Sequence, residues 1–218
     1  MFIKEAWAVY PINRIMPHTI NKWKEDTLKF NSGGSVNRKL DVLSSMYTTF
    51  KKEWGYPVDN PVLQIRRPKK AEPRDRRLSD AEIKKLLTGN RTSPIMKSII
   101  EISLETGMRL SEILRAEHDM IEGYTLKIPI AKTKPRVIPL TKRAQQLLRE
   151  NLPIRKSANA ILMMWKRLMK YYEIEDAHFH DLRHESICRL FTDKNLSVPE
   201  AQVISGHLEP RTLLKVYA

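Results

Sequence analysis

Four side chains in the last forty residues could act together on a phosphate. His180 and Arg183 lie three residues apart in HFHDLRH, where a helix is expected to begin, so both can converge on one anion. His207 follows Gly206, and a glycine leaves room for a phosphate to approach closely. Tyr217 lies on the expected last helix and carries a hydroxyl that can act as a nucleophile. Each feature alone is better explained by ordinary structure, so the function depends on what the rest of the chain adds.

The histidines and the cysteine do not indicate a metal site. His178, His180 and His184 lack a cysteine or acidic partner at ligand spacing, so we expect neither a metal nor another cofactor. Cys188 is the single cysteine, which excludes an internal disulfide framework and fits a reducing compartment. Its apolar neighbours Ile187 and Leu190 place it in the expected core.

Charge and hydropathy favour a polyanionic partner. The 218 residues are 41% hydrophobic, enough for a packed core, and carry a net charge of +14. Residues 1–77 hold 16 basic and 8 acidic side chains, so more than half of the excess lies in the first third. No apolar run approaches the roughly 18 to 20 residues of a membrane helix, and the start lacks the pattern of a signal peptide. We therefore expect a soluble, cytoplasmic protein whose first candidate partner is nucleic acid.

Two helices are expected near the start of the chain. The first runs from Pro17 to about Phe30, and the second runs from a cap at Ser35 to about Trp54, because apolar residues recur at three and four positions. The second helix has a core side and a cationic side. The cationic side carries Arg38, Lys39, Lys51 and Lys52, which we expect to face DNA.

A basic linker is expected between two domains. Residues 66–77 combine seven basic side chains with two prolines, which cannot form a packed element but can lie along phosphates; a solvated hinge is the alternative. The expected division is a helical domain over 1–65, the linker over 66–77 and a second domain over 78–218. The basic residues of the linker are Arg66, Arg67, Lys69, Lys70, Arg74, Arg76 and Arg77.

The second domain is expected to be mainly α with a small β-hairpin, an α+β fold. Ser79 and Glu82 have the spacing of a capping box, and Pro94 and Gly107 mark the start and end of a further helix. Arg109 then falls at a junction between two helices. Residues 124–140 alternate with period two and predict a hairpin, with Lys132 and Lys134 at its turn. Helices are expected again over 141–151 and 157–172, and the apolar stripe of the latter is Ile161, Leu162, Trp165, Leu168, Met169 and Tyr172, which we assign to the core.

These motifs occur in one order along the chain. TGMRLSEI, the lysine-bearing hairpin AKTKPR, HDLRH, a Gly-His pair and a C-terminal tyrosine together resemble the tyrosine recombinase (phage integrase) family. The resemblance covers most of residues 78–217. Upstream, INKWK, SVNRKLDVLSSMYTTFKKEWGY and the DNP turn are similar to part of that family's helical core-binding domain.

The resemblance implies roles for the residues that match the family's motifs. Arg109 and Arg183 would hold the non-bridging oxygens of the scissile phosphate, and Glu112 would orient that site. Tyr217 would be the nucleophile. The remaining groups would be Lys132 as general acid with Lys134 as the alternative, His180 as general base or proton shuttle, and His207 as a hydrogen-bond donor to the phosphate.

The resemblance also implies a reaction and partners. The expected activity is site-specific DNA recombination through a 3′-phosphotyrosyl intermediate, without metal or ATP, in the integration or excision of a mobile element. The expected partner is double-stranded DNA with inverted core half-sites, bound by a homotetramer that is monomeric or weakly associated without DNA. Alternatives are a catalytically silent DNA-binding regulator and a type IB topoisomerase-like enzyme. We also expect the core-binding domain to be incomplete and the family's segment beyond Tyr217, which docks on a neighbouring subunit, to be missing.

Overall fold

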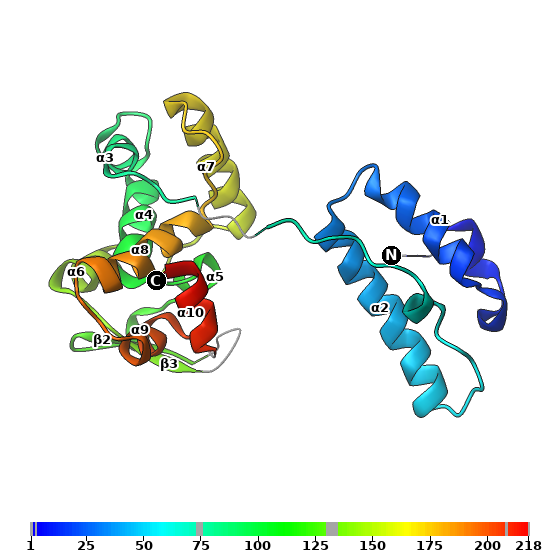
Figure 1. Cartoon of the computed structure of the whole chain (residues 1–218). Coiled ribbons are helices and arrows are strands. Elements are labelled where there is room, and N and C mark those ends of the chain that lie inside the picture. Colours follow the sequence, from blue (N-terminus) through cyan, green and yellow to red (C-terminus); the bar gives the residue numbers. More distant parts are fainter. Residues whose placement is uncertain (1, 3, 73–75, 130–134, 208, 218) are drawn as a thin grey trace. The chain divides into compact units, whose positions relative to one another are not determined.

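The chain forms two compact units (Figure 1). The computed structural model describes residues 2, 4–72, 76–129, 135–207 and 209–217, apart from the side chains of residues 212 and 215–217. The units are Met1–Arg74 and Asp75–Ala218, each with its own hydrophobic core. The division between them falls inside the expected linker.

The N-terminal unit is helical. Its elements are η1 (Ala6–Val9), η2 (Ile12–Arg14), α1 (Pro17–Leu28), α2 (Gly33–Lys52) and η3 (Pro61–Gln64). The two long helices pack against each other and against η3, and Tyr47 joins α2 to η2 because its hydroxyl donates to the carbonyl oxygen of Ile12 at 3.1 Å. The buried core of this unit is Trp7, Ile15, Ile20, Trp23, Val36, Leu40, Leu43, Tyr47, Val58 and Val62.

The start of α2 differs from the prediction. Ser32, not Ser35, caps the helix: its backbone is extended and its Oγ accepts from the backbone N–H of Ser35 at 3.3 Å. Gly33 and Gly34 therefore lie in the first turn instead of breaking the chain. A Cβ on Gly33 would collide with the carbonyl oxygen of Lys69, so glycine at this position lets the segment before the second unit pack against α2.

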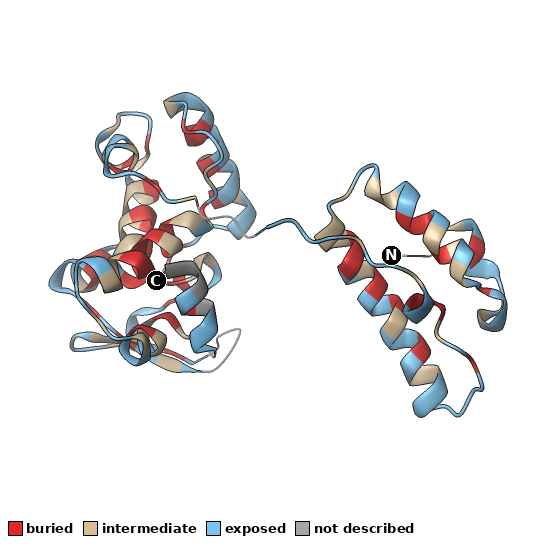
Figure 2. Ribbon diagram, viewed as in Figure 1, coloured by how far each residue is buried: buried red, intermediate tan, exposed pale blue. Residues whose placement is uncertain are grey.

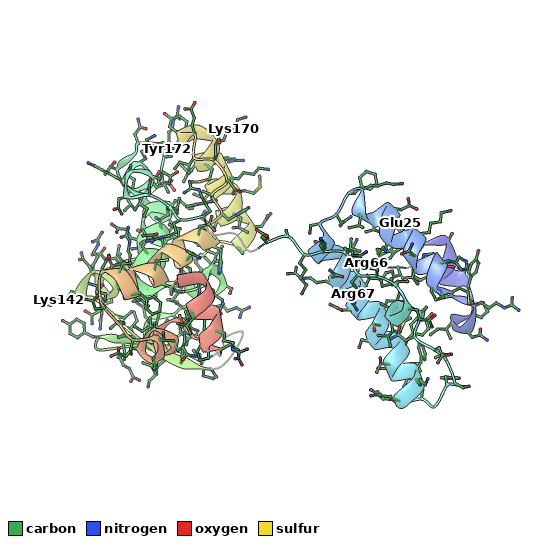
Figure 3. The ribbon with its side chains drawn as sticks, viewed as in Figure 1. Glu25, Arg66, Arg67, Lys142, Lys170 and Tyr172 are labelled. Atoms are coloured by element: carbon green, nitrogen blue, oxygen red, sulfur yellow. The ribbon has the colours of Figure 1, made fainter. Side chains whose placement is uncertain are left out.

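That packing holds the first residues of the expected linker. Asn37 Nδ2 donates to the carbonyl oxygen of Pro68 at 2.9 Å, and Lys24 Nζ donates to that of Arg66 at 3.1 Å. Arg67 pairs with Asp41 at 2.7 Å; Arg66 and Arg67 are both labelled in Figure 3. Residues 66–68 are thus bound to the N-terminal unit, although their composition alone predicted an extended linker.

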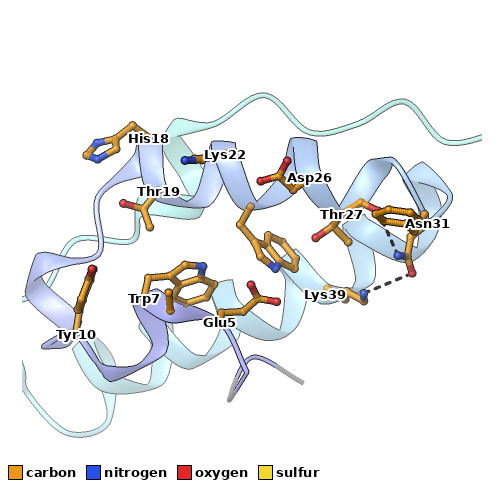
Figure 4. A pocket seen from close by; sticks show the side chains of 13 residues that line it. Glu5, Trp7, Tyr10, His18, Thr19, Lys22, Asp26, Thr27, Asn31 and Lys39 are labelled. Carbon is orange, nitrogen blue, oxygen red and sulfur yellow. Dashed lines mark hydrogen bonds between the residues drawn. The ribbon is translucent and has the colours of Figure 1, made fainter.

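An open pocket of about 750 Å³ lies beside α1 in this unit (Figure 4). Trp7 and Tyr10 line it from the N-terminal turns, and Lys22 lines it from α1. The indole nitrogen of Trp7 is buried without a hydrogen-bond partner among the described residues. Lys39, expected on a DNA-facing surface, also lines this pocket and donates to Asn31 Oδ1 at 3.5 Å.

The second unit is mainly helical with one small sheet. The strands β1 (Ile121–Glu122), β2 (Thr125–Ile128) and β3 (Arg136–Pro139) form an antiparallel sheet in the order β1-β2-β3. The hairpin of β2 and β3 confirms the prediction, while β1 and the short turn η4 (His118–Met120) were not predicted. The helices are α3 (Asp80–Thr88), α4 (Pro94–Thr106), α5 (Leu110–Ile113), α6 (Lys142–Asn151), α7 (Ala158–Tyr172), α8 (His180–Thr192), α9 (Val198–Ser205) and α10 (Pro210–Tyr217).

The local start and stop signals of these helices are confirmed. Ser79 and Glu82 make both bonds of a capping box. Gly107, with φ of 61°, ends α4 in the left-handed conformation that glycine adopts without a steric penalty. The stripe of α7 is largely buried as predicted, with one exception: Leu162 is 46% exposed because it lies one residue round the helix from Ile161.

The packing of this unit brings distant segments together. Helix α4 lies against α6 and α8, and α9 lies against β3 and α10. Figure 2 shows buried residues along both α4 and α8, the two helices that pack together. The turn after α4, the first turn of α8 and the turn after α9 are thereby held near one another. Among the described residues, no helix is long and apolar enough to cross a membrane.

Candidate active site

Arg109 lies at the junction between α4 and α5, as predicted. Its backbone N–H donates to Glu112 Oε2 at 2.9 Å, and its Nη1 donates to Glu112 Oε1 at 3.1 Å. The same glutamate therefore caps the short helix and holds the arginine side chain, which is 19% exposed. Its Nε and Nη2 have no acceptor among the described residues.

Arg183 is buried in the first turns of α8, with only 2% of its surface exposed. Its Nη1 donates to the carbonyl oxygen of Gly107, and its Nη2 donates to that of Ser205 at 2.5 Å. These carbonyls belong to the ends of α4 and α9. A charged side chain is stable in such a buried place when its N–H groups have acceptors, so Arg183 both supplies charge and fixes the two turns.

His180 is the first residue of α8 and lines a cavity of about 190 Å³ together with Arg183. The residue is exposed overall, yet its surroundings disfavour the charged ring. Desolvation lowers the pKa of His180, and the positive charges of Arg183 and Arg109 lower it further. These surroundings favour the neutral imidazole, which can accept a proton.

His207 follows the left-handed Gly206 that ends α9. Its Nδ1 lies 2.8 Å from Ser205 Oγ, and its backbone carbonyl accepts from Gln202 Nε2 at 3.2 Å. Burial lowers the pKa of His207 to about 4, with further contributions from the positive charges of Arg183 and Arg109. His207 is also neutral at pH 7.

Glu112 connects Arg109 to a second arginine that the sequence reasoning missed. Arg136 makes two parallel bonds to the carboxylate, Nη1 to Oε1 at 3.0 Å and Nη2 to Oε2 at 2.8 Å. Burial opposes the ionisation of Glu112, but its hydrogen bonds from Arg136 and from the backbone N–H of Arg109 outweigh that effect. They lower the pKa of Glu112 to about 2.

The strand pattern held a signal for Arg136. Side chains of a strand alternate between two faces, so Arg136 shares the inward face of β3 with the fully buried Ile138. It is paired across the sheet with Ile128, which is also buried. An arginine at an inward position of a strand needs a buried acceptor, which here is Glu112.

Cys188 lies in the core, as predicted. It is buried, and its Sγ lies 3.7 Å from His184 Nδ1. Burial raises the pKa of its thiol, which therefore stays protonated. In the part of the chain that the structure describes, no three His, Cys, Asp or Glu side chains gather as metal ligands.

Comparison with known sequences places this geometry in a family. The sequence pattern of the phage integrase family matches residues 76–218, which contain every residue of the site above. The chain belongs to the phage integrase family. It is similar to the Shufflon-specific DNA recombinase of Escherichia coli, with 36% identity over 197 residues that cover 85% of this chain and 51% of that protein. The chain thus spans about half the length of that relative.

Solved integrases have the same fold as this family member. A λ integrase (75–356) dimer bound to a COC′ core site matches with a TM-score of 0.80 and 21% identity, over 96% of this chain and 82% of that one. A λ integrase tetramer bound to a Holliday junction matches with a TM-score of 0.76 and 21% identity, over 92% and 66% of the two chains. At this identity the likeness establishes the fold.

Three expected groups of the integrase-family site lie outside what the structure describes. Lys132 and Lys134 fall among residues 130–134, and the side chain of Tyr217 is not described although its backbone belongs to α10. Leu213 of α10 is fully buried, and the helix packs against α8 and α9. The backbone of the expected nucleophile is therefore in a helix that contacts the elements bearing Arg183 and His207.

The basic residues expected to bind DNA differ in their surroundings. Arg38, Lys52, Lys69 and Lys70 are exposed, Lys51 pairs with Asp59 at 3.2 Å, and Arg74 lies outside the described residues.

The last two linker arginines are held by carboxylates of the second unit. Arg76 pairs with Glu82 at 2.6 Å, and Arg77 pairs with the buried Glu185 at 3.0 Å. Their charges stabilise the start of the integrase-family unit, and they are less available to a phosphate than the composition predicted.

Proposed function

We propose that this chain is the catalytic part of a site-specific DNA recombinase, in which Tyr217 cleaves a DNA strand through a transient 3′-phosphotyrosyl bond. The observation that carries the proposal is the gathering of Arg109, Arg183, His180 and His207. They come from three segments that are distant in sequence, and Arg183 bonds the backbone carbonyls that lie two residues before Arg109 and His207. Cationic guanidiniums beside neutral imidazoles suit an anionic phosphodiester that must be attacked and protonated in one place.

The arginines would stabilise the charge of the transition state. A phosphodiester repels nucleophiles, and its transition state gathers negative charge on the equatorial oxygens. Arg109 keeps Nε and Nη2 for those oxygens, since only its Nη1 is used by Glu112 among the described residues. Arg183 supplies a second guanidinium, whose Nη1 and Nη2 also donate to the carbonyl oxygens of Gly107 and Ser205. Two such groups stabilise the charge without a metal ion.

The histidines would handle protons. A neutral His180 accepts a proton, as a general base for the tyrosine hydroxyl must. When the Ser205 hydroxyl donates to Nδ1 of His207, the ring proton lies on Nε2, from which it can donate to a phosphate oxygen.

The proposed cleavage step needs no reactant other than the protein and the DNA. The Tyr217 hydroxyl gives its proton to His180 and its oxygen bonds to phosphorus, while the bond from phosphorus to the 5′ oxygen breaks. The leaving oxygen takes a proton from Lys132, or alternatively from Lys134. A phosphotyrosyl ester conserves the energy of the original bond, so a 5′ hydroxyl of another strand can reverse the step without ATP.

The proposed partner is duplex DNA with inverted half-sites. The net charge of +14 favours a polyanion, and the two λ integrase structures are a dimer on a core site and a tetramer on a Holliday junction. We extend this to four copies of this chain on two synapsed duplexes, and to integration or excision of a mobile element.

The test uses a pool of nicked duplexes of varied sequence. After cleavage beside a nick, the short fragment with the 5′ hydroxyl diffuses away, so a covalent protein-DNA adduct accumulates. The wild-type protein should form adducts that survive denaturing detergent, and the attached DNA should share a sequence. Tyr217→Phe should form none. Specific DNA binding without any adduct would instead indicate a silent regulator, and plasmid relaxation without a defined site would indicate a topoisomerase.

A further inference from the structure

We infer that Arg136 is a positioning residue of this site: it occupies the Glu112 carboxylate, so that Arg109 keeps most of its guanidinium for the scissile phosphate. The inference rests on the proposed cleavage reaction. It concerns a residue that acts through Glu112 and need not touch the DNA.

Every nitrogen of the Arg136 guanidinium has a partner. Nη1 and Nη2 bind the two oxygens of Glu112 at 3.0 and 2.8 Å, and Nε donates to the carbonyl oxygen of Ile204 at 3.2 Å. The Arg136 side chain is 7% exposed and that of Glu112 is 4% exposed. The planar fork of an arginine matches a carboxylate in this way, and a lysine ammonium cannot reproduce it.

The same carboxylate is shared with Arg109. Glu112 Oε1 accepts from both Arg136 Nη1 and Arg109 Nη1, while Oε2 accepts from Arg136 Nη2 and from the backbone N–H of Arg109. Two cations and one anion leave a net positive charge at the place where Arg109 would meet a phosphate. Without Arg136, the carboxylate could take a two-pronged bond from Arg109, which would neutralise that arginine and turn it away from the DNA.

Arg136 also touches the turn that carries His207. Gly206 has φ of +69°, and a Cβ there would lie 2.9 Å from Arg136 Cδ and 3.0 Å from its Nε. Together with the bond to Ile204, this contact joins β3, α5 and the end of α9 through one side chain. Arg136 therefore sets the position of Glu112, which holds Arg109, relative to the turn that carries His207.

The experiment compares single-turnover cleavage of a nicked duplex, at saturating protein, with DNA affinity measured separately. Arg136→Met should slow cleavage about 100-fold, the size of losing one preorganised charge contact, while affinity changes by less than about threefold. Arg136→Lys keeps a charge without the fork and should give an intermediate rate. Arg143→Met is the matched control, because Arg143 pairs with Glu101 on the surface and is 49% exposed; it should cleave at the wild-type rate.

A double variant separates the proposed role from a merely structural one. In Arg136→Met with Glu112→Gln, no carboxylate is left to neutralise Arg109, so cleavage should be faster than in Arg136→Met alone. The double variant also removes the carboxylate that Arg136→Met deprives of two hydrogen bonds. If Arg136→Met fails to fold, the double variant is compared with Glu112→Gln and should cleave at a similar rate, because Arg136 acts through Glu112. The inference would be overturned if the double variant lost cleavage rate by the product of the two single losses, or if Arg136→Met cleaved at the wild-type rate. Neither result would contradict the proposed function. Absence of any adduct with the wild-type protein would instead contradict the proposed function, and this inference with it.

Discussion

Arg183 Nη2 donates to the backbone carbonyl oxygen of Ser205 at 2.5 Å. Its Nη1 donates to the carbonyl oxygen of Gly107, so one buried side chain binds a backbone carbonyl at the C-terminal end of both α9 and α4. Each carbonyl lies two residues before a proposed catalytic group, His207 in one case and Arg109 in the other. The distance between those two groups therefore depends on the length and shape of Arg183.

Arg183→Lys should damage both stability and cleavage. A lysine has one nitrogen and cannot replace both bonds of a planar guanidinium, so at least one buried carbonyl loses its partner. We expect a loss of about 1–3 kcal/mol in the free energy of unfolding, measured with urea, and at least about 100-fold slower cleavage. Arg189→Lys is the control, because Arg189 pairs with Glu185 and Asp80 and is 33% exposed. Equal stability of the Arg183 and Arg189 variants would contradict the role of Arg183.

Gly206→Ala tests the close approach of Arg136 to the turn after α9. The alanine meets two penalties, a left-handed backbone and a Cβ pressed against Arg136. Gly123→Ala meets only the first, because Gly123 has φ of +53° and nothing lies within 4 Å of its added Cβ. We expect Gly206→Ala to unfold at lower urea than Gly123→Ala and to cleave more slowly. Similar effects of the two substitutions would show that the contact with Arg136 contributes to neither stability nor the cleavage rate.

The pH dependence of stability should report His207. Its pKa is lowered to about 4 in the folded protein, so below the ordinary value near 6.5 the unfolded chain binds a proton that the folded one does not. Stability is then fully present above pH 6.5 and is lost as the pH falls to about 4, by about 3 kcal/mol for this shift. Urea unfolding of the wild type and of His207→Gln between pH 7 and 4 measures it. The variant should lose less stability over this range, and parallel curves would count against the buried neutral histidine.

The contribution of Glu112 to stability should depend on pH in a more acidic range than that of His207. Its pKa is lowered to about 2, so its contribution is present above its ordinary pKa near 4.3 and is lost as the pH falls from there to about 2. Glu112→Gln should therefore flatten the stability curve below pH 4.5 and leave its shape between pH 5 and 7 unchanged. A change of shape confined to the neutral range would mean that another group carries the acid sensitivity.

The two ends of the expected linker should behave differently. Lys69 and Lys70 are exposed, so replacing both with alanine should weaken DNA binding and reduce the slope of log affinity against log salt by about 2. Arg77→Ala should mainly lower the stability of the second unit, because it leaves the buried Glu185 with fewer partners. Binding titrations over a range of salt concentrations, together with urea unfolding, distinguish these effects. A larger change in the salt slope from Arg77→Ala than from the lysine pair would reverse this assignment.

Local signals predicted most of the helices. Ser79 with Glu82, and Pro94 with Gly107, satisfy or end their own helix within a few residues, so the sequence alone is sufficient there. The start of α2 was placed wrongly at Ser35 because two glycines ordinarily break a helix. The packing of Lys69 against Gly33 is a contact across more than thirty residues, which no local pattern contains.

The residues of the candidate site also fall into two groups: those that local motifs predicted, and one that depended on the fold. The order of motifs was enough to propose Arg109, His180, Arg183 and His207, since each lies in a short recognisable segment. Arg136 was missed because its partners Glu112 and Ile204 are distant in sequence and become neighbours only when β3 packs against α9. Its inward position on the strand was visible, but the identity of its acceptor depended on the fold.

In the proposed mechanism, the Tyr217 oxygen becomes bonded to the 3′ phosphate of DNA. The most direct measurement is mass spectrometry of the wild-type adduct after nuclease and protease digestion, with the modified residue located in the peptide that ends the chain. The proposed mechanism should give a nucleotide joined through its 3′ phosphate to Tyr217, and Arg109→Ala should give an unmodified peptide. A nucleotide on any other side chain, or one joined through its 5′ phosphate, would contradict it.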